Sequence, residues 1–278
     1  MPVRESIPVA IAVAPNGARR SRHDHPTLPT APEQLAQCAA ECLAAGAAML
    51  HLHVRDTQER HSLDPGDYRA AIAAIRARVG DEMILQVTTE SGGRYAPPEQ
   101  MACAEALAPE AVSLAIRELF RDPADEVTIG KFLRRIAARG TLVQYIVYTP
   151  DDLAHCARLQ VAGLIPQVRP QVLFVLGSYA EQRVGRPVDL LPMLAALPAG
   201  WRWSICAFGP DELKCAAAAA LLGGQVRVGF ENNTQLPSGA AAADNAALVR
   251  ATVAAFAPLG MHPATCAEAR RLYRDARD

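Results

Sequence analysis

Met49-Leu50-His51-Leu52-His53-Val54-Arg55 is a short run in which polar residues alternate with leucine and valine. Side chains alternate across a β-strand, so the run predicts a strand with both histidines and the arginine on one side and the leucine and valine on the other. It is one of eight β-rich runs, and a helical stretch follows each of them. The runs are Pro8–Ala14, Met49–Arg55, Met83–Thr89, Ala111–Ile116, Leu142–Tyr148, Gln171–Gly177, Trp203–Phe208 and Gln225–Phe230.

Eight strand–helix repeats in 278 residues are typical of an α/β protein with a (β/α)8 TIM barrel. A doubly wound sheet has the same local alternation, and the number of repeats favours the barrel. We expect one barrel domain over residues 1–278, with an extra C-terminal helix at Cys266–Ala276 that covers one end of the barrel or a neighbouring subunit. In the first repeat, Thr30 and Glu33 predict a capping box, and Gly46 predicts the end of the helix.

The composition is that of a globular protein, with 50% hydrophobic residues, 21% charged residues and a net charge of −1. This charge argues against a dedicated nucleic-acid or membrane-surface binder. The longest apolar stretch, Cys215–Gly224, is much shorter than the ~20 residues that a membrane span needs. The seven cysteines are scattered and form no C-x-x-C pair, so we expect a cytoplasmic protein.

The run Met49–Arg55 also carries the strongest chemical signal. In a barrel, His51 and His53 would face the mouth, about 7 Å apart along one strand. The eighth run leads to Glu231, and barrel closure places its strand only two places from that of the histidines. Two imidazoles and a carboxylate with an open position suit catalytic zinc, although non-haem iron uses the same set.

The third run continues into Gln86-Val87-Thr88-Thr89-Glu90-Ser91-Gly92-Gly93. Gln86 and Thr88 share a face, and Thr88 could donate a hydrogen bond to a substrate oxygen. Gly92 and Gly93 would let the backbone approach a ligand closely. No G-x-G-x-x-G follows the first strand and no Walker loop is present, so dinucleotide and nucleoside triphosphate chemistry lack support.

Two segments resemble the signature segments of the β-keto acid cleavage enzymes, whose founding activity is 3-keto-5-aminohexanoate cleavage. One reads HLHVRD from His51 and the other reads GGQVRVGFENN from Gly223. The resemblance extends over almost the whole chain. Further similar segments are Pro26–Thr30, Gln86–Gly93, Phe174–Gly177 and Asn245–Val249.

The resemblance implies a barrel that holds one zinc ion per chain through His51, His53 and Glu231. It also implies a reaction in which a β-keto acid and acetyl-CoA give acetoacetate and a new CoA thioester. Zinc would polarise the keto group, Arg227 would offset charge on a carboxylate or oxyanion, and Thr88 would take the place of the family's serine. Related barrels imply a homotetramer.

The acid and base residues depart from the family pattern. Asn232 stands where many members have aspartate, and Arg19 stands at an expected acidic position in the first loop. Ala115 replaces an asparagine. The changes at Arg19 and Asn232 should disfavour an aminated substrate and favour a neutral or dicarboxylic β-keto acid.

Glu118 lies near the position of a small hydroxyl residue in the family. It is a substitute base, an amine-binding carboxylate, or only a partner of Arg117 or Arg121. The expected catalytic residues are thus Arg227, Thr88 and Glu118. Substrate contacts are expected from Arg19, Asn16, Asn232, Gly92 and Gly93.

Two other functions use the same scaffold. A metal-dependent aldolase or other lyase would act without CoA, and a catalytically silent barrel would keep its metal and only bind ligands. A Schiff-base aldolase is disfavoured because Lys131 and Lys214 both lie on predicted helices.

Overall fold

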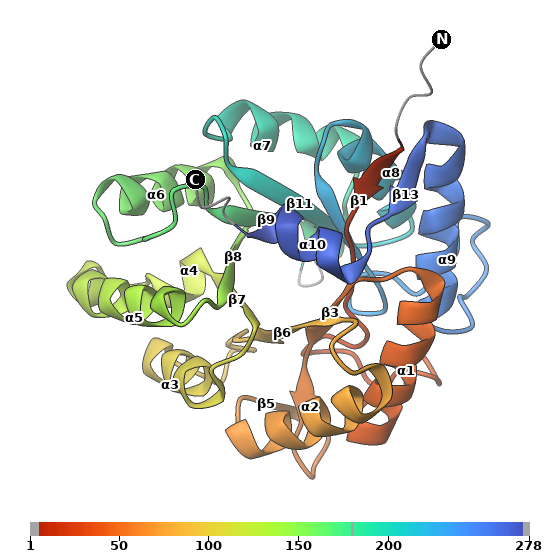
Figure 1. The fold of residues 1–278 in the computed structure, drawn as a ribbon, viewed down its shortest axis with the longest axis horizontal. Helices are drawn as coiled ribbons and strands as arrows, with labels where there is room; N and C mark the ends of the chain where they lie inside the picture. Colours follow the sequence, from red (N-terminus) through yellow and green to blue (C-terminus); the bar gives the residue numbers. More distant parts are fainter. Residues whose placement is uncertain (1–5, 179–180, 275–278) are drawn as a thin grey trace.

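Eight parallel strands form a closed ring in the structure, a computed structural model that describes residues 6–178 and 181–274 (Figure 1). Each strand pairs with the next, β8 pairs with β9, and β12 pairs with β2. The predicted (β/α)8 barrel is confirmed, and each strand falls on one of the eight runs. The strands are β2 (Ile11–Val13), β3 (Met49–Leu52), β6 (Ile84–Thr88), β7 (Ala111–Ala115), β8 (Leu142–Val147), β9 (Gln171–Ser178), β11 (Arg202–Ala207) and β12 (Gln225–Val228).

Helices surround the ring (Figure 1). Lys131 lies on α5 (Glu126–Ala138) and Lys214 on α8 (Glu212–Leu221), as expected. Within the described ranges, no helix has both the length and the apolar character required to cross a membrane. The outer helices are α1 (Pro32–Ala45), α2 (Pro65–Val79), α3 (Pro97–Leu107), α4 (Ile116–Leu119), α5 (Glu126–Ala138), α6 (Pro150–Val161), α7 (Leu190–Ala196), α8 (Glu212–Leu221) and α9 (Asn245–Phe256), with 3-10 turns at Pro123–Asp125, Pro187–Asp189 and Ala257–Leu259.

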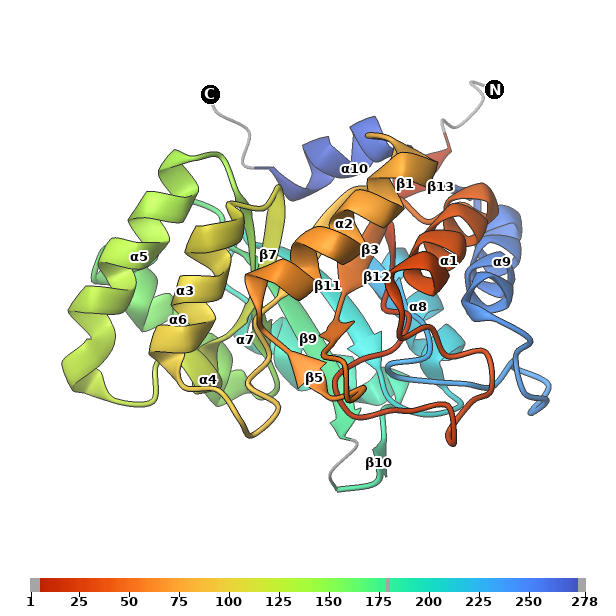
Figure 2. The ribbon, with the colours of Figure 1, turned by 90° about the horizontal axis from the view of Figure 1, so that it is seen from below.

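The N-terminal end of the barrel is covered by β1 (Ile7–Val9), β13 (Met261–Pro263) and α10 (Cys266–Tyr273). Ala269 and Tyr273 of α10 join the apolar cluster formed by Met49 and Ile84. Figure 2 shows α10 at the opposite end from the short strands β5 (His61–Ser62) and β10 (Arg183–Val184). β5 pairs with β4 (Val54–Arg55). The extra helix therefore covers one end of the barrel; residues 275 and 276 of its predicted range lie outside the described residues.

The N-cap of the first helix lies one residue after the predicted N-cap, Thr30. Its N-cap is Ala31, and the Gln34 side chain accepts hydrogen bonds from the N–H groups of Thr30 and Ala31. The predicted capping box of Thr30 and Glu33 is wrong. Pro32 explains the shift, because proline fixes its own φ and lacks an N–H group, and is therefore favoured at the first helical position.

The last barrel strand leaves the ring through a turn that requires glycine. Gly229 has a φ of 133°, and a Cβ at this position would lie 2.5 Å from the carbonyl oxygen of Ala14. The same carbonyl oxygen accepts a hydrogen bond from the N–H group of Glu231. Close contact between this turn and the end of β2 therefore sets the backbone position of Glu231.

Gly229→Ala should destabilise the protein more than Gly80→Ala. Gly80 also has a positive φ, but a Cβ there would meet nothing within 4 Å. Both variants carry the conformational cost of a positive φ, and only Gly229→Ala adds a contact with a backbone oxygen. In urea unfolding we expect the free energy of unfolding to fall by about 1–3 kcal/mol more for Gly229→Ala. Equal losses would contradict the role given to this turn.

Candidate metal centre

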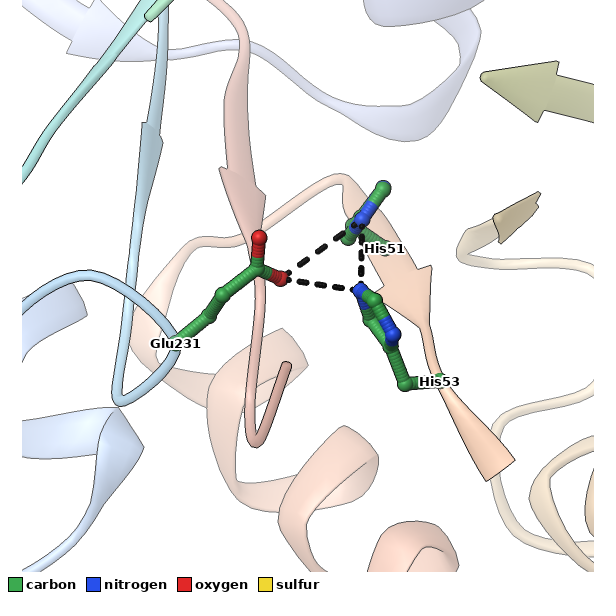
Figure 3. Close-up of side chains that lie close together, drawn as sticks. All are labelled: His51, His53 and Glu231. Atoms are coloured by element: carbon green, nitrogen blue, oxygen red, sulfur yellow. Dashed lines mark hydrogen bonds and ion pairs between the residues drawn. The ribbon is translucent and has the colours of Figure 1, made fainter. Parts of the chain in front are cut away.

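Two histidines and one glutamate meet at the C-terminal end of the barrel (Figure 3). His51 lies in β3, His53 follows that strand, and Glu231 comes from the turn after β12. The Nε2 atoms of the two imidazoles are 3.2 Å apart. Glu231 Oε2 lies 3.6 Å from Nε2 of His51 and 3.2 Å from Nε2 of His53. The structure thus brings together the three residues predicted as metal ligands.

The spacing of these three atoms fits a tetrahedral metal ion. Ligand atoms about 2.1 Å from zinc at tetrahedral angles lie about 3.4 Å from one another. Within the described part of the chain, the buried Oε2 atom of Glu231 has no hydrogen-bond donor. A buried carboxylate oxygen is costly unless a donor or a cation satisfies it. The three side chains could therefore hold a divalent metal such as zinc.

Gln86 on β6 orients His51. Its Oε1 atom lies 2.7 Å from His51 Nδ1, so Nδ1 carries the proton and Nε2 presents its lone pair toward the other two ligands. Gln86 donates to Gln144, which in turn donates to Ser204. This chain of buried amide and hydroxyl groups crosses the barrel interior and holds Gln86 in place.

Burial keeps both imidazoles neutral. It lowers the pKa of His51 to about 4 and the pKa of His53 to about 3. Burial opposes ionisation of Glu231, but Arg227 and the two neighbouring imidazoles together outweigh it and hold the pKa of this carboxyl group well below its usual value. At neutral pH the site therefore offers the protonation states that bind metal ions.

Arg227 lies in the barrel interior beside Glu231. Its Nη2 atom donates to Glu231 Oε1 at 2.9 Å, to Cys206 Sγ at 3.1 Å and to Asn232 Oδ1 at 3.2 Å. Its Nε and Nη1 atoms are buried and have no partner among the residues that the structure describes. A buried guanidinium group with two such donors can bind a carboxylate or an oxyanion.

Glu90 is a candidate functional residue that the sequence pattern did not single out. Its Oε2 atom lies 3.8 Å from Nε2 of His53, and its side chain is 26% exposed. Burial raises the pKa of Glu90 to about 7, and the negative charge of Glu231 acts in the same direction. A carboxyl group with this pKa can take up or release a proton near neutral pH. Glu90 lies two residues after Thr88 and is therefore expected on the same side of the strand, a signal that could have identified it.

Asn16 and Asn232 are both buried beside the metal group, and each keeps one unpaired amide atom. Asn16 donates from Nδ2 to the carbonyl oxygens of Pro29 and His53, and its Oδ1 atom has no partner among the described residues. Asn232 accepts from Arg227, and its Nδ2 atom likewise has no partner there. These atoms could bind a substrate, as predicted for both residues.

Arg19 is exposed at the entrance to this site. Together with Asn16, Glu90, Phe208 and Glu231, it lines a narrow pocket. Within the described part of the chain, its guanidinium group makes no hydrogen bond or ion pair, and its charge opposes the rise in the pKa of Glu90. A substrate contact by Arg19 stays a prediction.

Thr88, Gly92 and Gly93 belong to β6 and the loop that follows it. The Thr88 hydroxyl is buried and accepts a hydrogen bond from the N–H group of Glu90. A Cβ on Gly92 would lie 2.9 Å from the ring of His61, so this glycine leaves room for that imidazole. A substrate contact by these residues stays a prediction.

Glu118 lies on α4 and holds the loop after β6. Its carboxylate accepts hydrogen bonds from the N–H and hydroxyl groups of Ser91 and from Nε2 of Gln100. Arg117, one of its two expected partners, instead pairs with Asp152. A catalytic role for Glu118 stays a prediction, and its two oxygens already have donors.

The turn that carries Glu231 is held by a buried carboxyl group on α8. Glu212 accepts hydrogen bonds from the N–H group of Gly229 and from Nδ2 of Asn233. Burial raises the pKa of Glu212 to about 8, above the value of about 4.3 for an unperturbed glutamate. Folding therefore takes up a proton between these two values, so this group's contribution to stability decreases as the pH rises from about 4.3 to 8.

Glu212→Gln should remove this pH dependence. We expect the Tm of the variant minus the Tm of the wild type to increase from pH 5 to pH 8. Both proteins are measured without metal. Glu82→Gln, at an exposed position, should show no comparable change. A difference in Tm for Glu212→Gln that is independent of pH would contradict the raised pKa.

Known proteins resemble this chain over nearly its whole length. A family profile described as beta-keto acid cleavage enzyme matches residues 8–274. A 3-keto-5-aminohexanoate cleavage enzyme of Fusobacterium nucleatum subsp. nucleatum is 31% identical over 269 residues, which cover 94% of this chain and 96% of that protein. A 3-oxoadipate:acetyl-CoA acetyltransferase of Cupriavidus necator is 28% identical over 273 residues, with 95% and 94% covered.

Among solved structures, the binary complex of ObcA with oxaloacetate is similar in fold. The two structures align with a TM-score of 0.69 and 19% sequence identity. The alignment covers 89% of this chain and 67% of that chain. At this identity the likeness supports the barrel fold alone.

Proposed function

Because the chain belongs to the β-keto acid cleavage enzyme family, we propose that it is a zinc-dependent acyltransferase that acts on a β-keto acid and acetyl-CoA. The bond between C2 and C3 of the keto acid breaks, and the acyl group passes to CoA. The acetyl group of acetyl-CoA joins the released two-carbon fragment and gives acetoacetate. The products are therefore acetoacetate and a new CoA thioester.

One observation carries this proposal: Nε2 of His51, Nε2 of His53 and Oε2 of Glu231 lie 3.2 to 3.6 Å apart beside the guanidinium group of Arg227. Three protein ligands are the number typical of catalytic zinc sites. The names of the relatives support acetyl-CoA as co-substrate, since one is an acetyl-CoA acetyltransferase. One relative is named for 3-oxoadipate, a dicarboxylate, and another for 3-keto-5-aminohexanoate, an aminated acid. These names therefore do not determine the side chain of the substrate.

Zinc bound by His51, His53 and Glu231 would supply a Lewis acid for the keto group. The free Nε and Nη1 donors of Arg227 would bind the substrate carboxylate or offset charge that develops on an oxygen during acyl transfer. The unpaired amide atoms of Asn16 and Asn232 would orient the substrate through hydrogen bonds. Burial of Asn16, Asn232 and Arg227 would keep water away from the reacting atoms.

The two other functions make different demands. A lyase would cleave the keto acid without acetyl-CoA, and a silent barrel would bind it without product. The homotetramer and the cytoplasmic location stay predictions.

Zinc content tests the assignment of the ligands. The purified protein should contain about one zinc ion per chain, and His51→Ala or Glu231→Ala should lose most of it, because two remaining ligands bind zinc weakly. His23→Ala, an exposed position in the first loop, should keep it. Inductively coupled plasma mass spectrometry of the wild type and the three variants measures the zinc content per chain. Full zinc occupancy in both ligand variants would overturn the site.

Arg227→Gln tests the role of the guanidinium group. We expect kcat/KM for CoA-thioester formation to fall about 100-fold or more, because a preorganised donor to the transition state is lost. Zinc content must be measured on the same sample, since Arg227 also holds the charge of Glu231. Arg250→Gln on the outer helix α9 should leave kcat/KM unchanged. An unchanged rate in zinc-loaded Arg227→Gln would exclude this role.

A further inference from the structure

The interior of the barrel mouth has two chemically different halves. One half, on β12, β2 and β3, carries the metal group and Arg227. The other half, on β7, β8, β9 and β11, carries an apolar cluster that includes Ala115, Ile146, Val175 and Cys206, with Tyr148 and Phe208 packed against it. We call these six residues the apolar wall. In the ring order, β9 lies four strands from β3 and therefore directly across the barrel.

The parity of the strands shows that the apolar wall faces the interior. Gln144 reaches across the barrel to Ser204, so both side chains point inward. Ile146 lies two residues after Gln144 on β8, and Cys206 lies two residues after Ser204 on β11, so their side chains also point inward. Strand register pairs Ala115 with Ile146 and Val175 with Cys206. These residues therefore pack together one layer closer to the mouth than the buried amide and hydroxyl groups of Gln86, Gln144 and Ser204.

The apolar wall borders the metal centre. Nη2 of Arg227 lies 3.1 Å from Sγ of Cys206. Phe208 lines the same narrow pocket as Glu90 and Glu231. A substrate whose carboxylate and keto oxygen face the metal half would therefore direct the rest of its chain toward this surface.

Two charged groups near the apolar wall, on Arg117 and Glu118, already have partners. The guanidinium group of Arg117 stacks on the ring of Tyr148 and pairs with Asp152. The carboxylate of Glu118 accepts hydrogen bonds from Ser91 and Gln100. Neither group offers a vacant counter-charge for an ammonium or a carboxylate group placed against the wall.

Arg19 does not change this conclusion. Together with Asn232, it is the residue on which the sequence alone favoured a neutral or dicarboxylic substrate. In the structure it lines the same pocket as the carboxyl group of Glu90, and the two charges act on each other. Arg19 is exposed at the entrance, where solvent screens its charge, so a second carboxylate gains little there.

We propose that the apolar wall binds the substituent on the keto carbon, and that the preferred substrate is a β-keto acid with an uncharged alkyl side chain. This inference rests on the proposed function and adds the chemical class of the substrate. A carboxylate or an ammonium group on that side chain would be desolvated against the wall, where Arg117 and Glu118 are already paired, at a large cost in binding.

Matched pairs of substrates test the proposal. 3-Oxohexanoate and 3-oxoadipate differ by a methyl group in place of a carboxylate. 3-Oxo-5-methylhexanoate and 3-keto-5-aminohexanoate differ by a methyl group in place of an amine. With acetyl-CoA present, kcat/KM should be higher for the alkyl member of each pair by about tenfold or more. Lengthening the chain from 3-oxopentanoate to 3-oxohexanoate should raise kcat/KM about fourfold.

Two variants locate the effect on the apolar wall. Val175→Thr should lower the preference for 3-oxohexanoate over 3-oxoadipate about fivefold or more, because a hydroxyl group replaces a methyl group at the contact. Val161→Thr is the matched control, since Val161 is 89% exposed, and should leave the preference unchanged. Ile146→Val should move the preferred chain toward 3-oxoheptanoate, because it removes one methyl group from the wall.

Calorimetric binding without acetyl-CoA separates this proposal from the proposed function. If no acid yields a CoA thioester but 3-oxohexanoate binds about tenfold or more tightly than 3-oxoadipate, the proposed reaction fails and the apolar wall stands. If thioesters form and a charged member of either pair is preferred or equal, the reaction stands and the apolar wall is refuted. A preference for the alkyl acid that Val175→Thr leaves unchanged would also refute it.

Discussion

A carboxylate from the turn after β12 has to cross the end of β2 to reach one imidazole on β3 and another just after it, and the chemistry of the mouth depends on this approach. Gly229 allows it, because its missing side chain lets the turn lie against the carbonyl oxygen of Ala14. Glu212 supports the turn from α8 through its bonds to Gly229 and Asn233. With the backbone so placed, Glu231 brings one oxygen within 3.2 Å of His53 and the other within 2.9 Å of Arg227.

The site keeps an unusual number of polar groups out of water, and their mutual contacts limit the cost. Arg227 and Glu231 neutralise each other, and both imidazoles stay uncharged. The amide chain from Gln86 satisfies the second nitrogen of His51. Among the described residues, unpaired atoms remain on Glu231, on its hydrogen-bonded neighbour Arg227 and on Asn232, which Arg227 also contacts. Asn16, which lines the same pocket as Glu231, keeps another. This concentration of unsatisfied donors and acceptors is what a metal ion and an anionic substrate would complete.

The sequence predicts the barrel and the metal ligands because both depend on local periodicity. Alternation in the run Met49–Arg55 places His51 and His53 on one face, and the count of eight repeats brings Glu231 near them. The start of α1 was missed because Pro32 moves the helix, and Gln34 replaces the expected capping pair. These contacts join neighbouring residues, so the position of Pro32 in the sequence could have predicted the helix start.

The charges around the substrate could not be predicted in the same way. Arg19 and Glu90 lie 71 positions apart in the sequence and come to line one pocket only when the barrel closes. The hydrogen-bond partners of Glu118 could not be predicted either, because Ser91 and Gln100 lie 27 and 18 positions away in the sequence. The apolar wall is assembled from four strands, and none of its residues is distinctive in its own segment. Such features arise from tertiary packing.

The central claim is that this barrel transfers an acyl group to CoA at the His51, His53 and Glu231 centre. The most direct test supplies acetyl-CoA labelled with carbon-13 in the acetyl group, together with 3-oxohexanoate, to zinc-loaded and chelator-treated protein. The account predicts that the label appears in acetoacetate at C3 and C4, that the new CoA thioester is unlabelled, and that chelation abolishes both products. Unlabelled acetoacetate, cleavage without acetyl-CoA, or full activity after zinc removal would contradict it.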